Sequence, residues 1–241
     1  NPTGISYSDE VVRRFARLKP AAHDFRIFWD NAYGIHHLYD DKQDYLIEIL
    51  AECKRAGNPD LVYKFASTSK ITFPGSGVAT LATSPNNMED ILEQLKRQTI
   101  GYDNVNQLRH VRFFGDIHGM TEHMKKHADI IRPKFEAVDR ILNEELGEYD
   151  IASWTKPLGG YFVSFDSVPG CAKNIVSRCK KAGLIMTPAC ATWPYGRDPY
   201  DSNIRIAPTY PPLEDLEKAM KLFSLCVRYV TVEKLLEDAE A

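Results

Sequence analysis

Two short apolar segments separated by a helical pattern dominate the first third of the sequence. The segments are "FRIFWD" (residues 25–30) and "LVYKFAS" (61–67), and each is nearly continuous in apolar residues. Between them, "DYLIEILAECKRAG" (44–57) predicts a helix that ends at Gly57. Continuous apolar strands are typical of parallel sheets, and the order strand, helix, strand implies a right-handed crossover. The sequence therefore predicts an α/β fold with a largely parallel sheet.

The remaining elements suggest two domains. Ser8 is expected to cap a helix from Asp9 to about Leu18, before the first strand. Further elements are predicted as a strand at 77–84, helices at 87–100, 104–116 and 121–146, a strand at 159–166, a helix at 172–183, a strand at 203–208 and a helix at 213–238. The pattern becomes helical from about residue 87, and a long helix is suited to bridge two domains. The predicted domains are residues 1–130, with the sheet, and residues 131–241, a small α+β domain.

Composition narrows the possible functions. The 241 residues are 44% hydrophobic and 26% charged, with a formal net charge of −3, which is ordinary for a globular protein and lacks the basic clusters of nucleic-acid binding. No apolar run approaches the roughly 18 residues that span a membrane, so the default expectation is a cytoplasmic protein. The five cysteines have no C-x-x-C spacing and predict reduced, buried thiols, and the histidines have no metal-ligand spacing.

Polar residues follow or end several of the predicted strands. In chain order, the candidate site residues are Asn1 in "NPTG", Asp30 and Tyr33 in "DNAY", Ser67 and Lys70 in S-x-x-K, and Arg205 in "NIRIAP". Each also fits a structural role, such as a turn residue, a helix cap or a surface lysine. Their joint order is hard to obtain by chance, and open α/β sheets place ligand chemistry at strand ends.

With these motifs the chain resembles the class I/II aminotransferases, pyridoxal-phosphate enzymes of fold type I. It looks most like a bacterial subgroup of aspartate aminotransferases, on the segments "DFRIFWDNAYGIHHL", "STSKITFPGSGVA", "VNQL", "GGYF" and "NIRIAP". The resemblance runs across essentially the whole chain. It implies the C-terminal part of a fold type I transferase, with an incomplete, mostly parallel sheet of the large domain and a small α+β domain.

The resemblance implies a role for each residue around the cofactor pyridoxal phosphate. Lys70 would form a Schiff base with the cofactor aldehyde and then, as a free amine, move a proton at the substrate α-carbon. Asp30 would keep the pyridine nitrogen protonated, so that the ring can accept electrons. Tyr33 and Asn1 would hydrogen-bond the phenolic oxygen of the ring.

The same resemblance assigns the phosphate and the substrate. Ser67 would donate to the cofactor phosphate, with Ser69 or Thr68 as second choices. Arg205 would hold the substrate α-carboxylate through its planar pair of donors. Asn1 would also lie against the substrate.

Two departures from the family pattern stand out. Many relatives carry a phosphate-binding arginine eight residues after the lysine, and here that position is Val78. Close backbone approach at Gly75 and Gly77 is one hypothesis for a replacement. The family's N-P-T-G turn also lies well inside the protein, whereas this sequence begins with it, so we expect a missing N-terminal segment and an isolated fragment that neither folds stably nor transaminates.

The expected reaction exchanges an amino group between an acidic amino acid, aspartate or glutamate, and a 2-oxo acid. Other readings are a pyridoxal-phosphate lyase or decarboxylase, and the aminotransferase-like sensing domain of a transcription regulator. A homodimer is expected from the family. The cation for a side-chain carboxylate stays open among Arg97, Arg109 and Arg112, a missing segment and a partner subunit.

Overall fold

The computed structural model describes residue 1 and residues 3–240 of the chain. Pro2, expected to stiffen the first turn, lies outside the described residues. The chain forms two compact units. The Lys70 unit comprises residues 6–35 and 44–124, and the Arg205 unit comprises residues 1–5, 36–43 and 125–241. The predicted domains, 1–130 and 131–241, stay a prediction for the whole protein.

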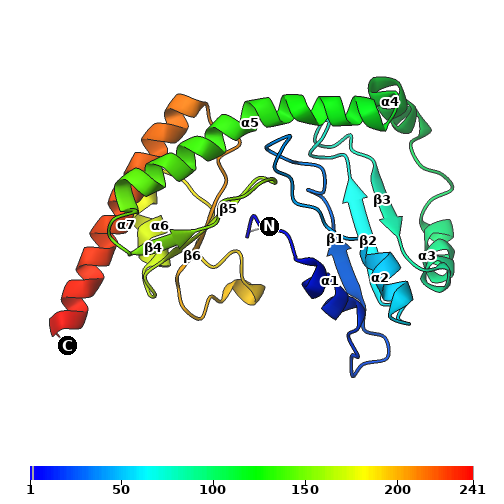
Figure 1. Cartoon of the computed structure of the whole chain (residues 1–241), viewed down its shortest axis with the longest axis horizontal. Coiled ribbons are helices and arrows are strands. Elements are labelled where there is room, and N and C mark those ends of the chain that lie inside the picture. The colour runs from blue at the N-terminus through cyan, green and yellow to red at the C-terminus, as the bar shows by residue number, and fades with distance from the viewer. Residues whose placement is uncertain (2, 241) are drawn as a thin grey trace. The chain divides into compact units, whose positions relative to one another are not determined.

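The Lys70 unit is built on a three-stranded sheet in the order β1-β2-β3 (Figure 1). The strands are β1 (Ile27–Asp30), β2 (Val62–Ser67) and β3 (Ala79–Ala82). β1 and β2 are parallel, joined through a helix as predicted, and Asp30 pairs with Phe65. β3 runs antiparallel to β2, unlike the largely parallel sheet expected, because the chain between them turns back without a crossover helix.

Helices cover the core of this unit. α1 (Asp9–Ala16) begins after Ser8, whose hydroxyl accepts the Val11 N–H, as expected of a cap. α2 (Ile49–Arg55) packs with α1 around the buried Trp29 of β1. The other helices are α3 (Pro85–Gln98), α4 (Asn104–Phe114) and the first part of α5 (Ile117–Leu146).

The Arg205 unit contains a second three-stranded sheet, antiparallel and in the order β4-β5-β6. Its strands are β4 (Ala152–Trp154), β5 (Val163–Ser167) and β6 (Asn203–Ile206), and a short 3-10 helix, η1, spans Pro194–Gly196. The later part of α5 packs with α6 (Ala172–Lys181) and α7 (Leu213–Glu240) against the sheet (Figure 1). At the centre of this core the rings of Phe165 and Phe223 meet edge to face, 4.9 Å apart.

Most predicted elements are present, with shifted ends. The strand predicted at 159–166 begins at Val163, because Gly160 has a φ of +78° and donates its N–H to the His36 carbonyl, so that Gly159 forms an isolated bridge with His37 and does not continue β5. The helix predicted at 121–146 begins at Ile117, shortly after α4 ends at Phe114. β4 was not predicted, since three residues are too few for an alternating pattern to mark a strand.

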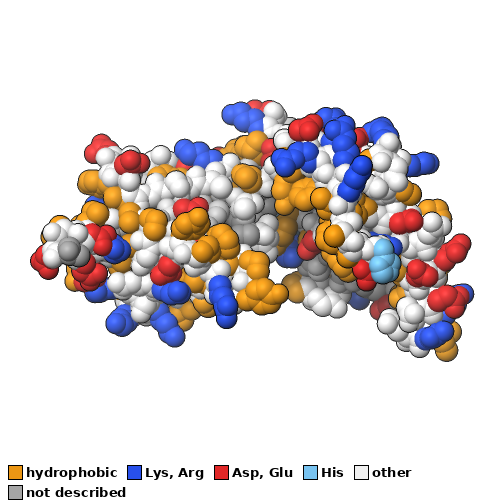
Figure 2. All heavy atoms as spheres, turned by 90° about the horizontal axis from the view of Figure 1, so that it is seen from below, with side chains coloured by type: hydrophobic (Ala, Val, Ile, Leu, Met, Phe, Trp, Pro, Cys, Tyr) orange, Lys and Arg blue, Asp and Glu red, His pale blue; other side chains and the backbone are white. Residues whose placement is uncertain are grey.

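Charged and apolar side chains are mixed on the face drawn in Figure 2. In the part of the chain that the structure describes, no helix is both long and apolar enough to cross a membrane. Among the same residues, no group of three or more His, Cys, Asp or Glu side chains is arranged to hold a metal ion.

Candidate active site

The carboxyl ends of β1 and β2 bring the first predicted residues to one edge of the sheet. β1 ends at Asp30 and β2 ends at Ser67, two residues beyond the position paired with Asp30. Lys70 follows three residues after Ser67, in the turn that leaves the strand. Two parallel strands end at the same edge, so the acid, the hydroxyl and the amine share it.

Tyr33 lies beside Lys70. The Lys70 Nζ is 4.7 Å from the centre of the Tyr33 ring. The chain turns after β1 because the Asp30 Oδ1 accepts the Ala32 N–H at 3.0 Å and the Gly34 N–H donates to the Asn31 carbonyl at 3.2 Å. This turn returns the tyrosine toward the lysine, and both side chains belong to the same unit.

The three hydroxyls before Lys70 have different partners. The Ser67 and Ser69 hydroxyls lie 2.7 Å apart and hydrogen-bond one another. Thr68 Oγ1 instead accepts the Val78 N–H at 2.9 Å and lies 2.8 Å from the His110 Nε2. Thr68 thus holds the loop together, whereas the Ser67 and Ser69 hydroxyls contact one another.

Val78 closes the loop that carries Lys70. Its carbonyl accepts the Thr68 N–H at 2.9 Å, and its N–H is used by the Thr68 hydroxyl. The main chain of Val78 is therefore committed to the loop. Gly77 serves packing in the same loop, because a Cβ there would lie 2.8 Å from the Ser69 Cα.

The Arg205 unit brings together the other two predicted residues. Arg205 lies in β6, and its Nη1 donates to the Asn1 Oδ1 at 3.1 Å. Its Nη2 donates to the Thr187 Oγ1 at 3.3 Å, and its guanidinium carbon is 4.6 Å from the centre of the Phe162 ring. Among the described residues, no carboxylate forms an ion pair with Arg205, and its buried Nε has no hydrogen-bond partner. Neutral groups orient a guanidinium that can still bind an anion.

The chain before β6 is organised by Asp198, which is 8% exposed. Its carboxylate accepts the N–H groups of Tyr200, Ser202 and Asn203, each at 2.9 Å. Burial acts to raise the pKa of Asp198, but these backbone hydrogen bonds outweigh it and hold the pKa below its ordinary value. The charged carboxylate therefore fixes the turn that leads into the strand of Arg205.

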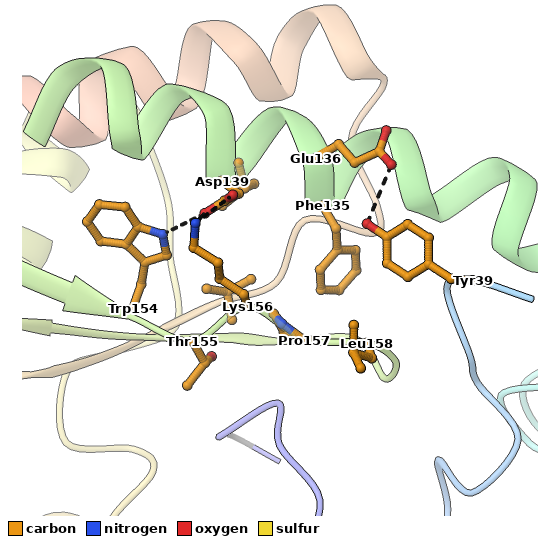
Figure 3. A pocket seen from close by; sticks show the side chains of 11 residues that line it. Tyr39, Phe135, Glu136, Asp139, Trp154, Thr155, Lys156, Pro157 and Leu158 are labelled. Atoms are coloured by element: carbon orange, nitrogen blue, oxygen red, sulfur yellow. Dashed lines mark hydrogen bonds and ion pairs between the residues drawn. The ribbon is translucent and has the colours of Figure 1, made fainter. Parts of the chain in front are cut away.

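A pocket of about 180 Å³ lies elsewhere in the Arg205 unit (Figure 3). Figure 3 shows Trp154 and Lys156 pointing toward Asp139, and their nitrogens lie 2.9 and 3.1 Å from its carboxylate. The Tyr39 hydroxyl donates to Glu136 at 3.4 Å, and burial together with the Glu136 charge raises the pKa of Tyr39. The described residues that line this pocket include none of the predicted site residues.

Comparison with known proteins identifies the family. A family model described as "Aspartate amino-transferase" matches residues 1–239 of the chain. The chain belongs to the aspartate aminotransferase family. A relative from Mycolicibacterium smegmatis whose name describes an aminotransferase is 48% identical over 238 residues, 99% of this chain and 55% of its own length. An aspartate aminotransferase from Corynebacterium glutamicum is 42% identical over 233 residues, 97% of this chain and 54% of its own.

Solved aminotransferases show the same fold. The crystal structure of an aspartate transaminase from C. glutamicum matches with a TM-score of 0.94 and 42% identity, over 97% of this chain and 55% of that one. An α-aminoadipate aminotransferase from Thermus thermophilus, complexed with N-(5'-phosphopyridoxyl)-L-leucine, matches with a TM-score of 0.77 and 18% identity, over 96% and 57% of the two chains. The predicted resemblance and fold class, part of a fold type I transferase, are confirmed. The chain spans about half the length of the curated relatives it matches.

Three residues that contact Arg205 or the loop of Lys70 were not predicted from the sequence. Phe162 lies in the "GGYF" segment that supports the resemblance, and this was the available signal for it. Thr187 lies in a stretch without a motif, and His110 lies on a predicted helix where one histidine gives no signal. Arg97, Arg109 and Arg112 are exposed in the Lys70 unit and stay candidates for a second carboxylate.

Proposed function

We propose that the whole protein transfers an amino group between an acidic amino acid, aspartate or glutamate, and a 2-oxo acid, with pyridoxal phosphate as cofactor. The observation that carries the proposal is the cluster of Lys70, Asp30, Tyr33, Ser67 and Ser69 at one sheet edge. Membership of the aspartate aminotransferase family supports it. The family also supports a homodimer as the working form.

The donor set at this edge fits the cofactor. An amine suits an aldehyde, a carboxylate suits a protonated pyridine nitrogen, a phenol suits a phenolic oxygen, and paired hydroxyls suit a phosphate. When bound, pyridoxal phosphate supplies an aldehyde carbon for a covalent bond to nitrogen and a ring that accepts electrons. The amine and the phenol lie close together, since the Lys70 Nζ is 4.7 Å from the centre of the Tyr33 ring.

Each of these residues would have a separate role in the reaction. As a general base, the Lys70 amine would accept the proton from the substrate α-carbon. As a general acid, it would then donate this proton to the cofactor carbon. Asp30 would hold a proton on the ring nitrogen, and Tyr33 would donate to the phenolic oxygen, a role that we also propose for Asn1. Arg205 would bind the substrate α-carboxylate with the geometry that Asn1, Thr187 and Phe162 give it.

Covalent labelling tests the central assignment. The full-length protein is incubated with pyridoxal phosphate, reduced with borohydride and digested for peptide mapping. We expect the label on Lys70, its loss in Lys70→Arg, and its retention in Lys64→Arg, a control on β2 whose side chain pairs with Glu48. A label on a lysine other than Lys70 contradicts the assignment.

Product analysis tests the reaction class. With aspartate and 2-oxoglutarate, the protein is expected to form oxaloacetate and glutamate in equal amounts, and Lys70→Arg is expected to form neither. Release of carbon dioxide or ammonia from aspartate without glutamate formation would instead indicate a decarboxylase or a lyase. Binding of the amino acid without any product would indicate a sensing domain.

A further inference from the structure

The loop that carries Lys70 is held by a helix outside the predicted site. Residues 68–78 leave β2 and return to β3, and Figure 1 shows α4 and the beginning of α5 beyond the carboxyl end of β2. From α4, the His110 Nε2 lies 2.8 Å from the Thr68 Oγ1 and 3.2 Å from the Thr72 Oγ1. These two threonines stand two residues before and two residues after Lys70.

The direction of the hydrogen bonds follows from the chemistry of the partners. The His110 Nδ1 lies 2.9 Å from the Asn106 carbonyl oxygen, which only accepts, so Nδ1 carries the hydrogen. In the neutral ring Nε2 is then an acceptor, and the Thr68 hydroxyl donates to it. The Thr68 oxygen in turn accepts the Val78 N–H. One continuous chain of hydrogen bonds therefore connects the closing residue of the loop with the backbone of α4.

The main chain of Thr68 also stabilises the turn around Lys70. Its carbonyl accepts the N–H groups of Ile71 and Thr72, both at 2.9 Å, and the Thr72 hydroxyl at 3.1 Å. These bonds bend the main chain sharply at Ser69 and Lys70. Thr68 thus hydrogen-bonds the turn that carries Lys70, and its hydroxyl contacts both His110 and Val78.

We propose that His110 is a positioning residue for Lys70, acting through the hydroxyl of Thr68. The proposal rests on the proposed function, in which Lys70 carries the chemistry. His110 itself touches neither cofactor nor substrate in this scheme. Its effect is to keep the Lys70 amine at the place where the proton is transferred, and small misplacements of such a group are costly to the rate.

Other contacts support the loop and limit the expected effect. From α5, the His123 Nε2 lies 2.8 Å from the Ile71 carbonyl oxygen. From α4, the Asn106 amide donates to the Ser76 carbonyl at 2.8 Å. Replacement of His110 leaves these contacts in place. We therefore expect the loop to stay folded, and only the position of the Lys70 amine to become less precise.

Substitution of His110 in the full-length protein tests the role. His110→Phe keeps a ring of similar size and removes the hydrogen bonds to Thr68 and to the Asn106 carbonyl, whereas His110→Gln keeps a polar group that can reach Thr68. We expect kcat to fall about 10-fold in His110→Phe with KM changed less than about 3-fold, because lysine placement affects the proton transfer more than substrate binding. His110→Gln is expected to recover most of the loss. His118→Phe, at an exposed histidine of α5, is the matched control and should behave as the wild type.

A second pair of variants guards against a folding defect. Thr68→Val keeps the branched shape and removes the hydroxyl, while Thr68→Ser keeps the hydroxyl. We expect Thr68→Val to lose as much kcat as His110→Phe, Thr68→Ser to lose little, and the double variant Thr68→Val/His110→Phe to be no worse than either single variant. Additive losses in the double variant would overturn the proposed connection.

Hydrogen exchange without added cofactor provides a readout that does not depend on activity. Amides of residues 68–78 are expected to exchange roughly 3- to 10-fold faster in His110→Phe, the range for one lost hydrogen bond, with the rest of the Lys70 unit unchanged. Unchanged exchange, or faster exchange with unchanged kcat, overturns the positioning role. If borohydride reduction does not fix pyridoxal phosphate on Lys70 of the wild-type protein, the proposed function is overturned instead. Failure of the positioning role and failure of the proposed function are therefore distinguishable.

Discussion

Asp198 shows how one buried charge can support a site residue that it does not touch. The carboxylate faces three backbone N–H groups in the turn before β6, and Arg205 lies two residues beyond the last of them, Asn203. The Asn203 side chain also donates to the Ser164 hydroxyl of β5 at 2.9 Å. The turn and the two strands therefore form one hydrogen-bonded unit.

Asp198→Asn is expected to lower the free energy of unfolding by about 1–3 kcal/mol, because its amide NH₂ would face N–H groups that need an acceptor. The pKa of Asp198 in the folded protein lies below its ordinary value, so its contribution is complete above the unfolded pKa and is lost as the pH falls through the folded pKa. The difference between wild type and variant should thus shrink below about pH 4. Urea unfolding at several pH values measures it. Asp24→Asn, at an exposed carboxylate, is the control, and a difference that does not depend on pH would contradict this reading.

At the scale of single residues, the sequence could predict types of residue and not their contacts. The places of Asp30 and Lys70, at and just after strand ends, were predictable from the apolar segments before them. Arg205 contacts Phe162 and Thr187, which belong to segments distant in sequence. Only folding brings these two residues to the Arg205 guanidinium. His110 was unpredictable for the same reason, since its distance from Thr68 along the chain hides the contact.

At the scale of elements, the loop between β2 and β3 depends on two glycines for different reasons. Gly77 packs against the Ser69 backbone, and a Cβ would lie 2.8 Å from the Ser69 Cα and 2.9 Å from its nitrogen. Gly75 has a φ of +83°, and among the described residues no atom outside Gly75 and its two chain neighbours lies within 4 Å of the place that a Cβ would occupy there. Gly77 is therefore required by a close approach, and Gly75 by backbone conformation.

Gly77→Ala is expected to displace Ser69 and the neighbouring Lys70, because backbone atoms at this distance must shift. Gly75→Ala should cost about 1–2 kcal/mol of stability from the left-handed backbone alone and leave the lysine in place. Borohydride labelling of Lys70 with pyridoxal phosphate, compared between the two variants, separates these effects. Equal labelling in both variants, matching the wild type, would show that the close approach at Gly77 does not position the lysine.

Element order was predictable from apolar segments and turn residues, whereas the direction of β3 was not. The parallel pair of β1 and β2 follows from the helix between them. β3 was expected within a largely parallel sheet, and its antiparallel direction depends on Thr68 and Val78, which close the loop by pairing with one another. A strand pattern carries no information on such a closure.

At the scale of the whole molecule, one face of the first sheet carries an exposed aromatic residue, Phe28, beside the half-buried rings of Tyr63 and Phe65. Phe28 is 71% exposed, although its neighbour Trp29 on the other face is only 7% exposed. The Phe28 ring stacks on Phe65 at 5.6 Å with an angle of 2°, and lies 5.6 Å from the ring of Tyr63. Sheets with parallel strands are normally covered on both faces, so this aromatic surface, formed by Phe28, Tyr63 and Phe65, is unusual for an exposed position.

Residues 1–241 produced alone are therefore expected to bind the apolar dye ANS and to show no turnover of aspartate with 2-oxoglutarate. Phe28→Ser should reduce the dye fluorescence, because it removes the centre of the aromatic surface. Phe73→Ser is the matched control, since Phe73 is 72% exposed but lies in a loop, where a single apolar side chain offers little area to the dye. Turnover by this polypeptide without dye binding would mean that the aromatic surface is tolerated in water and that the described residues suffice for the reaction. Dye binding that Phe28→Ser and Phe73→Ser reduce equally would place the exposed apolar area outside the sheet.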